Sequence, residues 1–244
     1  MSAPTAVVPG TDDARTHELA RNLRDLHQRI ADACAIAGRT SGEVTLVAIT
    51  KTWPAADVRR LAELGVTDVG ESRDQEAREK VAECGGLPVR WHFVGQLQRN
   101  KAASVARYAD VVESVDRLAL VDSLDRGADR ADRTVGVCLQ VDLDESGPGG
   151  RGGARPEALP ELADAVAAAA RLHLLGVMAV APLGAAPERA FARLAQVHET
   201  LMFDHPEAAM RSAGMSGDFA EAISAGATHV RLGSALLGRR DPLK

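Results

Sequence analysis

Residues 44–50 read Val-Thr-Leu-Val-Ala-Ile-Thr, a nearly continuous run of β-branched and aliphatic side chains that is followed directly by Lys51. Such a run is typical of a strand that is buried on both faces in a parallel sheet. Upstream, aliphatic residues recur at helical spacing, namely Leu19, Leu23, Leu26 and Ile30. They predict one amphipathic helix from about Asp12 to Ala37, which Gly38 ends.

An alternation of short apolar strands and amphipathic helices continues along the rest of the chain. The pattern predicts strands at residues 44–50, 66–70, 89–94, 110–115, 135–142, 172–178, 208–214 and 228–232. It predicts helices near residues 55–64, 73–83, 98–107, 117–129, 157–170, 188–203 and 218–225. Several expected helix ends carry a proline or glycine: Pro54, Pro156 and Pro187 at starts, Gly65 and Gly226 at stops.

Eight strands in strict alternation with helices, within 244 residues, are the pattern of a (β/α)8 TIM barrel. An open, doubly wound sheet is the alternative, but no Gly-x-Gly-x-x-Gly follows the first strand. We therefore predict an α/β fold, a single (β/α)8 barrel over residues 14–244 with an extra N-terminal helix. Residues 1–13 are predicted to form a disordered tail.

The composition excludes several classes of protein. With 34 acidic and 29 basic residues the net charge is −5, the wrong sign for holding a nucleic-acid backbone. Three cysteines without zinc-binding spacing predict neither a disulfide framework nor a metal site, as suits a reducing cytoplasm. Residues 1–10 lack signal-peptide features, and the apolar stretch 163–181 is interrupted by charged residues. We expect a cytoplasmic protein that binds neither membrane nor nucleic acid.

A glycine-rich stretch at residues 144–153 interrupts the alternation. It predicts a mobile loop between the fifth strand and its helix, on the face that carries the active site in such barrels. Two interpretations stay open, a solvated linker or a lid formed by residues 147–153 over a ligand.

Side chains at the carboxyl ends of barrel strands surround one pocket. The candidates there are Lys51, Glu71, Ser72, His92, Gly95, Ser114, Asp116, Gln140, Asp142, Met178, Ser216, Arg231, Gly233 and Ser234. Lys51 is one of only four lysines beside 25 arginines, so an amine nucleophile has few alternatives. At the end of an apolar strand its stem lies in a low dielectric, which favours the neutral amine that attacks carbonyl carbon. The other interpretation is an ammonium that extends into solvent.

Two serines stand where helices begin after the last two strands, Ser216 in Gly214-Met215-Ser216-Gly217 and Ser234 after Gly233. Such positions bind phosphate, and barrels often keep phosphate beside these strands, although each serine could instead only cap its helix. Arg231 lies in an apolar strand, so its charge must be paired or face the pocket. His92 is either an acid–base group or a structural histidine. Glu71 and Asp116 could also be helix caps.

Short motifs follow one another in order along residues 15–240. They are Val44 to Thr52, Gly70-Glu71, Gln75-Glu76, Trp91-His92-Phe93-Val94-Gly95, Leu97-Gln98, Asn100-Lys101, Ser114-Val115-Asp116, Gly214-Met215-Ser216, Asp218-Phe219 and Val230-Arg231-Leu232-Gly233. Together they resemble the pyridoxal phosphate homeostasis protein family, also called the YggS or PROSC family. The resemblance implies a barrel of the alanine racemase type that holds pyridoxal 5′-phosphate (PLP) as a Schiff base on Lys51.

The resemblance also implies the other contacts of the cofactor. Ser216, Gly233 and Ser234 would hold the phosphate, and Arg231 would face the pyridine nitrogen. Ser72 is assigned to the same site, although many relatives have asparagine at its position, and threonine is more common than serine at that of Ser234. The resemblance implies no metal and no established catalytic residue.

Family members are regarded as carriers or regulators of free cofactor, which implies a role in intracellular PLP homeostasis. The expected partners are PLP and apo PLP-dependent enzymes, and the expected state is a monomer. An arginine beside the pyridine nitrogen keeps that nitrogen unprotonated, which weakens carbanion chemistry. Two alternatives stay open: a low-activity PLP-dependent amino acid racemase with Lys51 as one base, and a scaffold that acts through Gln98–Lys101. A racemase needs a second base, and the sole tyrosine, Tyr108, is expected to lie away from the pocket.

Overall fold

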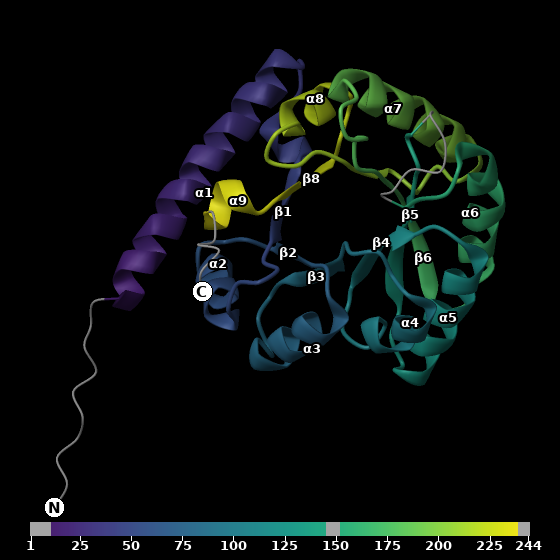
Figure 1. Cartoon of the computed structure of the whole chain (residues 1–244), viewed down its shortest axis with the longest axis horizontal. Helices are drawn as coiled ribbons and strands as arrows, with labels where there is room; N and C mark the ends of the chain where they lie inside the picture. The colour runs from purple at the N-terminus through teal and green to yellow at the C-terminus, as the bar shows by residue number, and fades with distance from the viewer. Residues whose placement is uncertain (1–10, 145–151, 239–244) are drawn as a thin grey trace, which may run out of the picture.

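A computed structural model of the chain describes residues 11–144 and 152–238. In these residues, eight parallel strands form a closed barrel in the order β1 to β8 (Figure 1). The strands are β1 (Thr45–Ile49), β2 (Asp68–Glu71), β3 (Arg90–Phe93), β4 (Val111–Val115), β5 (Val135–Gln140), β6 (Leu172–Met178), β7 (Met210–Ser212) and β8 (His229–Leu232). β8 pairs with β1, where Ala48 lies opposite Leu232, and this pairing closes the ring.

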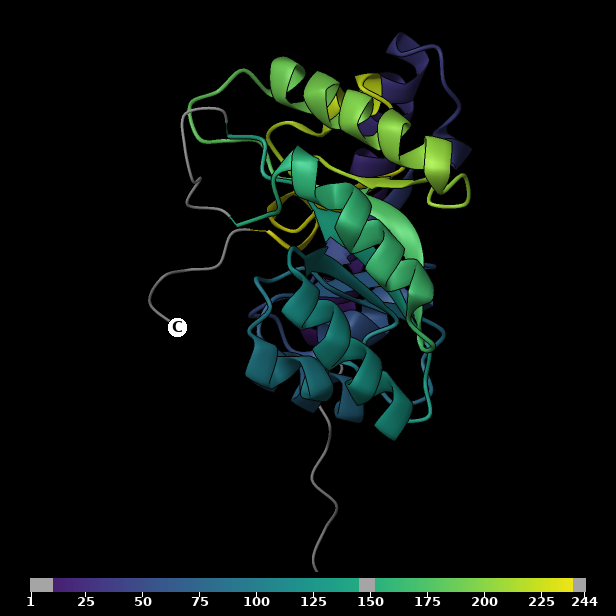
Figure 2. The ribbon, with the colours of Figure 1, turned by 90° about the vertical axis from the view of Figure 1, so that its right-hand side faces the viewer.

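The helices lie outside the ring of strands (Figure 1). They are α1 (Thr11–Ile36), α2 (Ala55–Glu63), α3 (Asp74–Glu83), α4 (Arg99–Val105), α5 (Leu118–Arg130), α6 (Leu159–Ala168), α7 (Pro187–Asp204), α8 (Phe219–Ser224) and α9 (Ser234–Leu237). Short 3₁₀ helices, η1 (Ser41–Glu43) and η2 (Pro156–Ala158), precede β1 and α6. In Figure 2, α4 to α7 lie next to one another over one side of the barrel.

The predicted (β/α)8 barrel with an extra N-terminal helix is confirmed, and the differences are at the ends of elements and in one short helix. The strand predicted over residues 208–214 is only Met210–Ser212, and the one over 135–142 ends at Gln140. α9 was not predicted. Of the predicted tail, residues 1–10 lie outside the described residues, whereas residues 11–13 already belong to α1. The predicted lid also falls largely on residues 145–151, outside the described part.

The N-terminal helix α1 closes the side of the barrel that β1 and β8 form. Its buried face consists of Leu19, Leu23, Leu26 and Ile30. These side chains share one apolar cluster with residues of α8 and α9, among them Phe219, Ile223, Leu236 and Leu237. Figure 1 shows α1 running beside both short helices. Burial of aliphatic side chains therefore makes α1 part of the barrel, because each of them contributes about 1.5–3 kcal/mol when it leaves water.

The interior of the barrel is unusually polar. Aliphatic side chains normally fill such a barrel in layers. Here Asp68, His92, Glu113, Ser212 and Arg231 are all 5% exposed or less. A small apolar cluster of Val111, Cys138, Met178 and Met210 lies beside them. The charged centre of the barrel has to be internally compensated, because burial of an unpaired charge is costly.

No helix in residues 11–144 or 152–238 has the length and apolar character needed to cross a lipid bilayer. Cys34, Cys84 and Cys138 are free thiols and all three are buried.

Candidate functional site

The pairing of β1 with β8 brings Lys51 to the same edge of the barrel as Gly233 and Ser234. Ala48 lies opposite Leu232, and the residues that follow continue toward this edge together. The approach is close, because a Cβ atom at Gly233 would lie 3.2 Å from the backbone oxygen of Ile49. A larger residue at position 233 would therefore fit only if β1 moved by a few tenths of an ångström.

Lys51 is exposed, which corrects the expectation that its side chain lies in a low dielectric. The reason is that β1 ends at Ile49, so Lys51 lies beyond the strand, in a turn. Within the described residues, the ammonium of Lys51 forms no hydrogen bond or ion pair. Two other lysines are paired: Lys80 with Glu71 at 2.5 Å, and Lys101 with Asp74 at 3.7 Å. Lys51 is therefore the available amine among these three.

Ser216 and Ser234 meet at this edge, although 18 positions separate them in the sequence. The hydroxyl of Ser234 donates a hydrogen bond of 3.2 Å to the hydroxyl oxygen of Ser216. Neither serine is a side-chain cap, since α8 has Asp218 and α9 has Gly233 at the N-cap, without a side-chain cap bond. The two hydroxyls therefore form one polar pair at the surface, and the cap-only interpretation is wrong for both.

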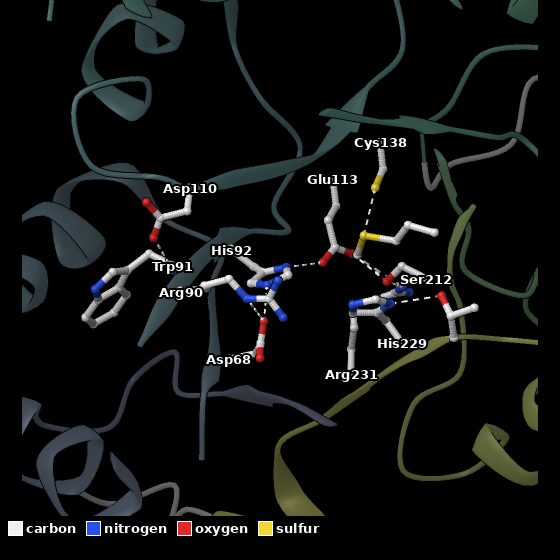
Figure 3. Close-up of polar contacts among 12 residues, drawn as sticks. Asp68, Arg90, Trp91, His92, Asp110, Glu113, Cys138, Ser212, His229 and Arg231 are labelled. Carbon is white, nitrogen blue, oxygen red and sulfur yellow. Dashed lines mark hydrogen bonds and ion pairs between the residues drawn. The ribbon is translucent and has the colours of Figure 1, made fainter. Parts of the chain in front are cut away.

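Arg231 extends from β8 into the buried centre of the barrel (Figure 3). One terminal nitrogen donates to the Ser212 hydroxyl at 2.7 Å, and the other donates to the backbone oxygen of Ala179 at 2.8 Å. A carboxylate oxygen of Glu113 lies 3.7 Å from the guanidinium. Burial lowers the pKa of Arg231, and the charge of Glu113 opposes this effect. Of the two alternatives for Arg231, a paired charge is therefore the one that the structure shows.

His92 is a structural histidine held between two carboxylates. Its Nδ1 lies 2.7 Å from Glu113 and its Nε2 lies 2.9 Å from Asp68 (Figure 3). An ionised carboxylate only accepts hydrogen bonds, so both ring nitrogens carry a proton and the ring is an imidazolium. Burial by itself would lower the pKa of His92, but the bonds to Asp68 and Glu113 outweigh it and raise the pKa to about 9.

The two carboxylates complete a continuous polar chain through the barrel. Glu113 also accepts a 2.6 Å hydrogen bond from the Ser212 hydroxyl, which in turn accepts from Arg231. Burial would raise the pKa of Glu113, yet His92 and Arg231 hold it below its ordinary value. The chain thus couples the charge of Arg231 to that of His92 through Glu113.

A second buried group lies directly behind the Lys51 turn. Lys80 donates to the Glu71 carboxylate at 2.5 Å and to the backbone oxygen of Thr50 at 2.8 Å. It also contacts Glu76 at 3.1 Å. Burial raises the pKa of Glu71, although Lys80 and the Thr50 hydroxyl oppose the change. Glu71 is therefore an ion-pair partner and not the helix cap that was one interpretation of it.

The remaining candidates lie at the strand ends but play different parts. Ser72 follows β2 with its backbone against Gly95, where a Cβ atom would lie 2.1 Å from the Ser72 carbonyl oxygen. Asp116 accepts a hydrogen bond from the Arg117 side chain instead of capping a helix. The others are mostly inaccessible from solvent: Ser114, Gln140, Asp142 and Met178 are at most 9% exposed.

Sequence reasoning missed Asp68, Lys80, Glu113 and Ser212. For Glu113 a signal existed, because a charged residue inside the apolar run Val111-Val112-Glu113-Ser114-Val115 is as unusual as Arg231 in its strand. Lys80 carried no such signal, since its neighbours in α3 are the mixed charges of an ordinary exposed helix.

Comparisons with known proteins agree with the barrel fold. The family model described as alanine racemase, N-terminal domain, matches residues 16–241. The pyridoxal phosphate homeostasis protein of Mycobacterium leprae is 40% identical, covering 92% of this chain and 93% of the relative. PipY of Synechococcus elongatus, solved with PLP bound, is 33% identical with a TM-score of 0.76, covering 90% of this chain and 100% of PipY. An alanine racemase of Clostridium difficile shares the fold alone, with 14% identity and a TM-score of 0.69 over 93% of this chain and 57% of the racemase.

Proposed function

The chain belongs to the pyridoxal phosphate homeostasis protein family, and we propose that it holds PLP as a Schiff base on Lys51 and releases it to other proteins. The observation that carries this proposal is that three groups lie at the same edge of the barrel. They are the amine of Lys51, which has no partner in residues 11–144 and 152–238, the hydroxyl pair of Ser216 and Ser234, and the backbone at Gly233.

The donor set fits a phosphorylated aldehyde. The Ser216 and Ser234 hydroxyls offer hydrogen bonds to phosphate oxygens, and Gly233 lies next to them at the N-cap of α9. PLP contributes an aldehyde that condenses reversibly with a primary amine. Lys51 would supply the primary amine for this condensation, which releases the aldehyde oxygen as water.

Arg231 is proposed to donate to the ring nitrogen of the cofactor. Its hydrogen bonds to Ser212 and Ala179 use two of the five N–H groups of a guanidinium, so donors remain. Glu113 and Ser212 hold the guanidinium in place from the buried side. An arginine does not lose its proton at neutral pH, so it favours an unprotonated ring nitrogen and a poor electron sink.

This electrostatic arrangement supports a carrier in preference to a racemase. A racemase with Lys51 as one base needs a second base across the substrate. The phenol of Tyr108 is a poor second base, since Tyr108 is 8% exposed and belongs to an apolar cluster of strand and helix residues. Turnover of several amino acids should therefore be absent. Racemisation that disappears in Lys51→Ala would favour the enzyme instead.

The direct test is the visible absorption band of a protein-bound PLP imine, with borohydride reduction and peptide mapping. We expect the band in the wild type and its loss in Lys51→Ala, with the reduced label on Lys51. Lys101→Ala is the matched control, because Lys101 is also exposed but already lies near Asp74. A label on Lys80 or Lys101 would contradict the assignment of Lys51.

We further propose that the protein is a cytoplasmic monomer that supplies apo PLP-dependent enzymes. Its large exposed apolar side chains are dispersed over different elements, which supports a monomer: Ile36, Leu118, Leu183, Phe203 and Met215. The buried free thiols suit a reducing compartment. Light scattering coupled to size exclusion tests the monomer, and transfer of bound PLP to an apo aminotransferase tests the release.

A further inference from the structure

The turn that carries Lys51 is held on both sides by one group of charged residues. On the N-terminal side, Thr50 is fully buried, and its backbone oxygen accepts a 2.8 Å hydrogen bond from Lys80. Its hydroxyl donates to Glu71 at 2.6 Å, the same oxygen that Lys80 contacts. This side of the turn is therefore fixed to β2 and α3.

The C-terminal side of the turn has an unfavourable backbone conformation. Thr52 has a φ of +68°, in the left-handed region that residues with a branched Cβ rarely occupy. Its backbone N–H donates a hydrogen bond to Oε1 of Glu76. Lys80 lies 3.1 Å from the same oxygen of Glu76. A strained residue persists only when its surroundings hold it, and here the Glu76 carboxylate does so.

We propose that Glu76 is a positioning residue for Lys51, which it acts on through the backbone of Thr52, with Lys80 holding both flanks of the turn. The inference rests on the proposed function, in which Lys51 is the amine that joins PLP. Glu76 is not itself a catalytic residue, because it contacts the turn and not the reacting nitrogen. Without its carboxylate, Thr52 relaxes toward negative φ, and fewer molecules present Lys51 in the competent arrangement.

The expected effect is on the apparent affinity for PLP. Ligand affinity falls by the fraction of molecules in the competent conformation. Loss of one charge-assisted hydrogen bond corresponds to about a tenfold fall in that fraction, so Glu76→Ala should raise the dissociation constant for PLP about tenfold. Glu76→Gln keeps an acceptor oxygen for the Thr52 N–H and should lose less.

Two further variants separate positioning from general damage. Glu79→Ala is the matched control, since Glu79 is exposed on the same helix and bonds only weakly to Gln75, at 3.4 Å. Thr52→Gly should bind PLP like the wild type, because glycine reaches positive φ without support. In the Thr52→Gly background, Glu76→Ala should therefore lose less than about threefold, since the hydrogen bond is no longer needed to hold the turn.

The experiment is an absorbance titration of each purified apo-protein with PLP, accompanied by urea unfolding without PLP. Unchanged affinity in Glu76→Ala, or an equal tenfold loss in both backgrounds, would overturn the proposal. If Glu76→Ala does not fold, Glu76→Asp is titrated in both backgrounds with the same expectations. Aspartate is one methylene shorter than glutamate, so its carboxylate is drawn back from the Thr52 N–H. Lys51→Ala separates a failure of the proposed function from a failure of this inference. A retained imine band in Lys51→Ala contradicts the proposed function. A lost band in Lys51→Ala, together with wild-type PLP affinity in Glu76→Ala, contradicts only the inference about Glu76.

Discussion

The imidazolium of His92 should make the stability of this protein depend on pH in an unusual direction. His92 is 2% exposed and lies between Asp68 and Glu113. Its pKa is about 9 in the folded protein, against an ordinary value of 6.5. The folded state therefore binds a proton that the unfolded state releases near pH 6.5. The stabilisation is complete below pH 6.5 and is lost as the pH rises through about 9.

The size of the effect follows from the displacement of the pKa. A rise from 6.5 to about 9 corresponds to roughly 3 kcal/mol of unfolding free energy. This is a large share of the net unfolding free energy of a domain, which is about 5–15 kcal/mol. His92→Gln removes the titrating group while retaining a polar side chain between the carboxylates. The variant should be less stable than the wild type at pH 6.5 and approach it above pH 9.

Urea unfolding at a series of pH values from 6 to 9.5 measures this difference. Comparison of the two proteins is essential, because burial raises the pKa of the Cys34, Cys84 and Cys138 thiols. Their ionisation in the unfolded state also lowers stability at high pH, equally in both proteins. His173→Gln is the control, since His173 is exposed on β6. The difference in unfolding free energy between the wild type and His173→Gln should not change with pH. A gap between wild type and His92→Gln that stays constant from pH 6.5 to 9.5 would refute an imidazolium at this position.

Three substitutions should alter stability in ways that urea unfolding can measure at neutral pH. Gly176→Ala should lower the unfolding free energy by on the order of 3–5 kcal/mol. Gly176 has a φ of +149°, and a Cβ atom there would lie 1.8 Å from the Met210 carbonyl oxygen. A wild-type urea midpoint would contradict the β6–β7 packing. Leu26→Ala should cost about 2–5 kcal/mol, since Leu26 is 1% exposed, and an unchanged midpoint would mean that α1 unfolds separately from the barrel. Ser212→Ala should cost about 1–3 kcal/mol, because it removes the hydroxyl that links Arg231 to the buried carboxylate, whereas a neutral effect would argue against that link.

The polar interior has consequences at acid pH as well. His229, which stacks at an angle 6.4 Å from His92, has its pKa lowered to about 4, chiefly by burial. It is therefore neutral in the folded protein at pH 6.5, while the unfolded state gains a proton as the pH falls. This contribution is present above pH 6.5 and is lost between pH 6.5 and about 4. The two histidines therefore narrow the pH range of maximal stability, His92 from the alkaline side and His229 from the acid side.

Part of the site was accessible to sequence reasoning because its signals are local. Lys51 directly follows the strongest apolar strand, and Ser216, Gly233 and Ser234 follow the last two strands with small residues around them. Closure of the barrel brings these strand ends together whatever their separation along the chain. From this topological rule, the sequence predicted that Ser216, Gly233 and Ser234 lie at the same edge of the barrel as Lys51.

The sequence alone determined the alternation of strands and helices from β1 to β8, the apolar face of α1, and the closed parallel barrel. Periodicity, proline and glycine act over a few residues, so they can be recognised in the chain itself. Only the tertiary structure decided that Lys51 is exposed, that Lys80 is buried behind it, and that His92 is charged between two carboxylates. These properties depend on which side chains meet across the closed ring, and the dielectric and the partners of a charge are set there.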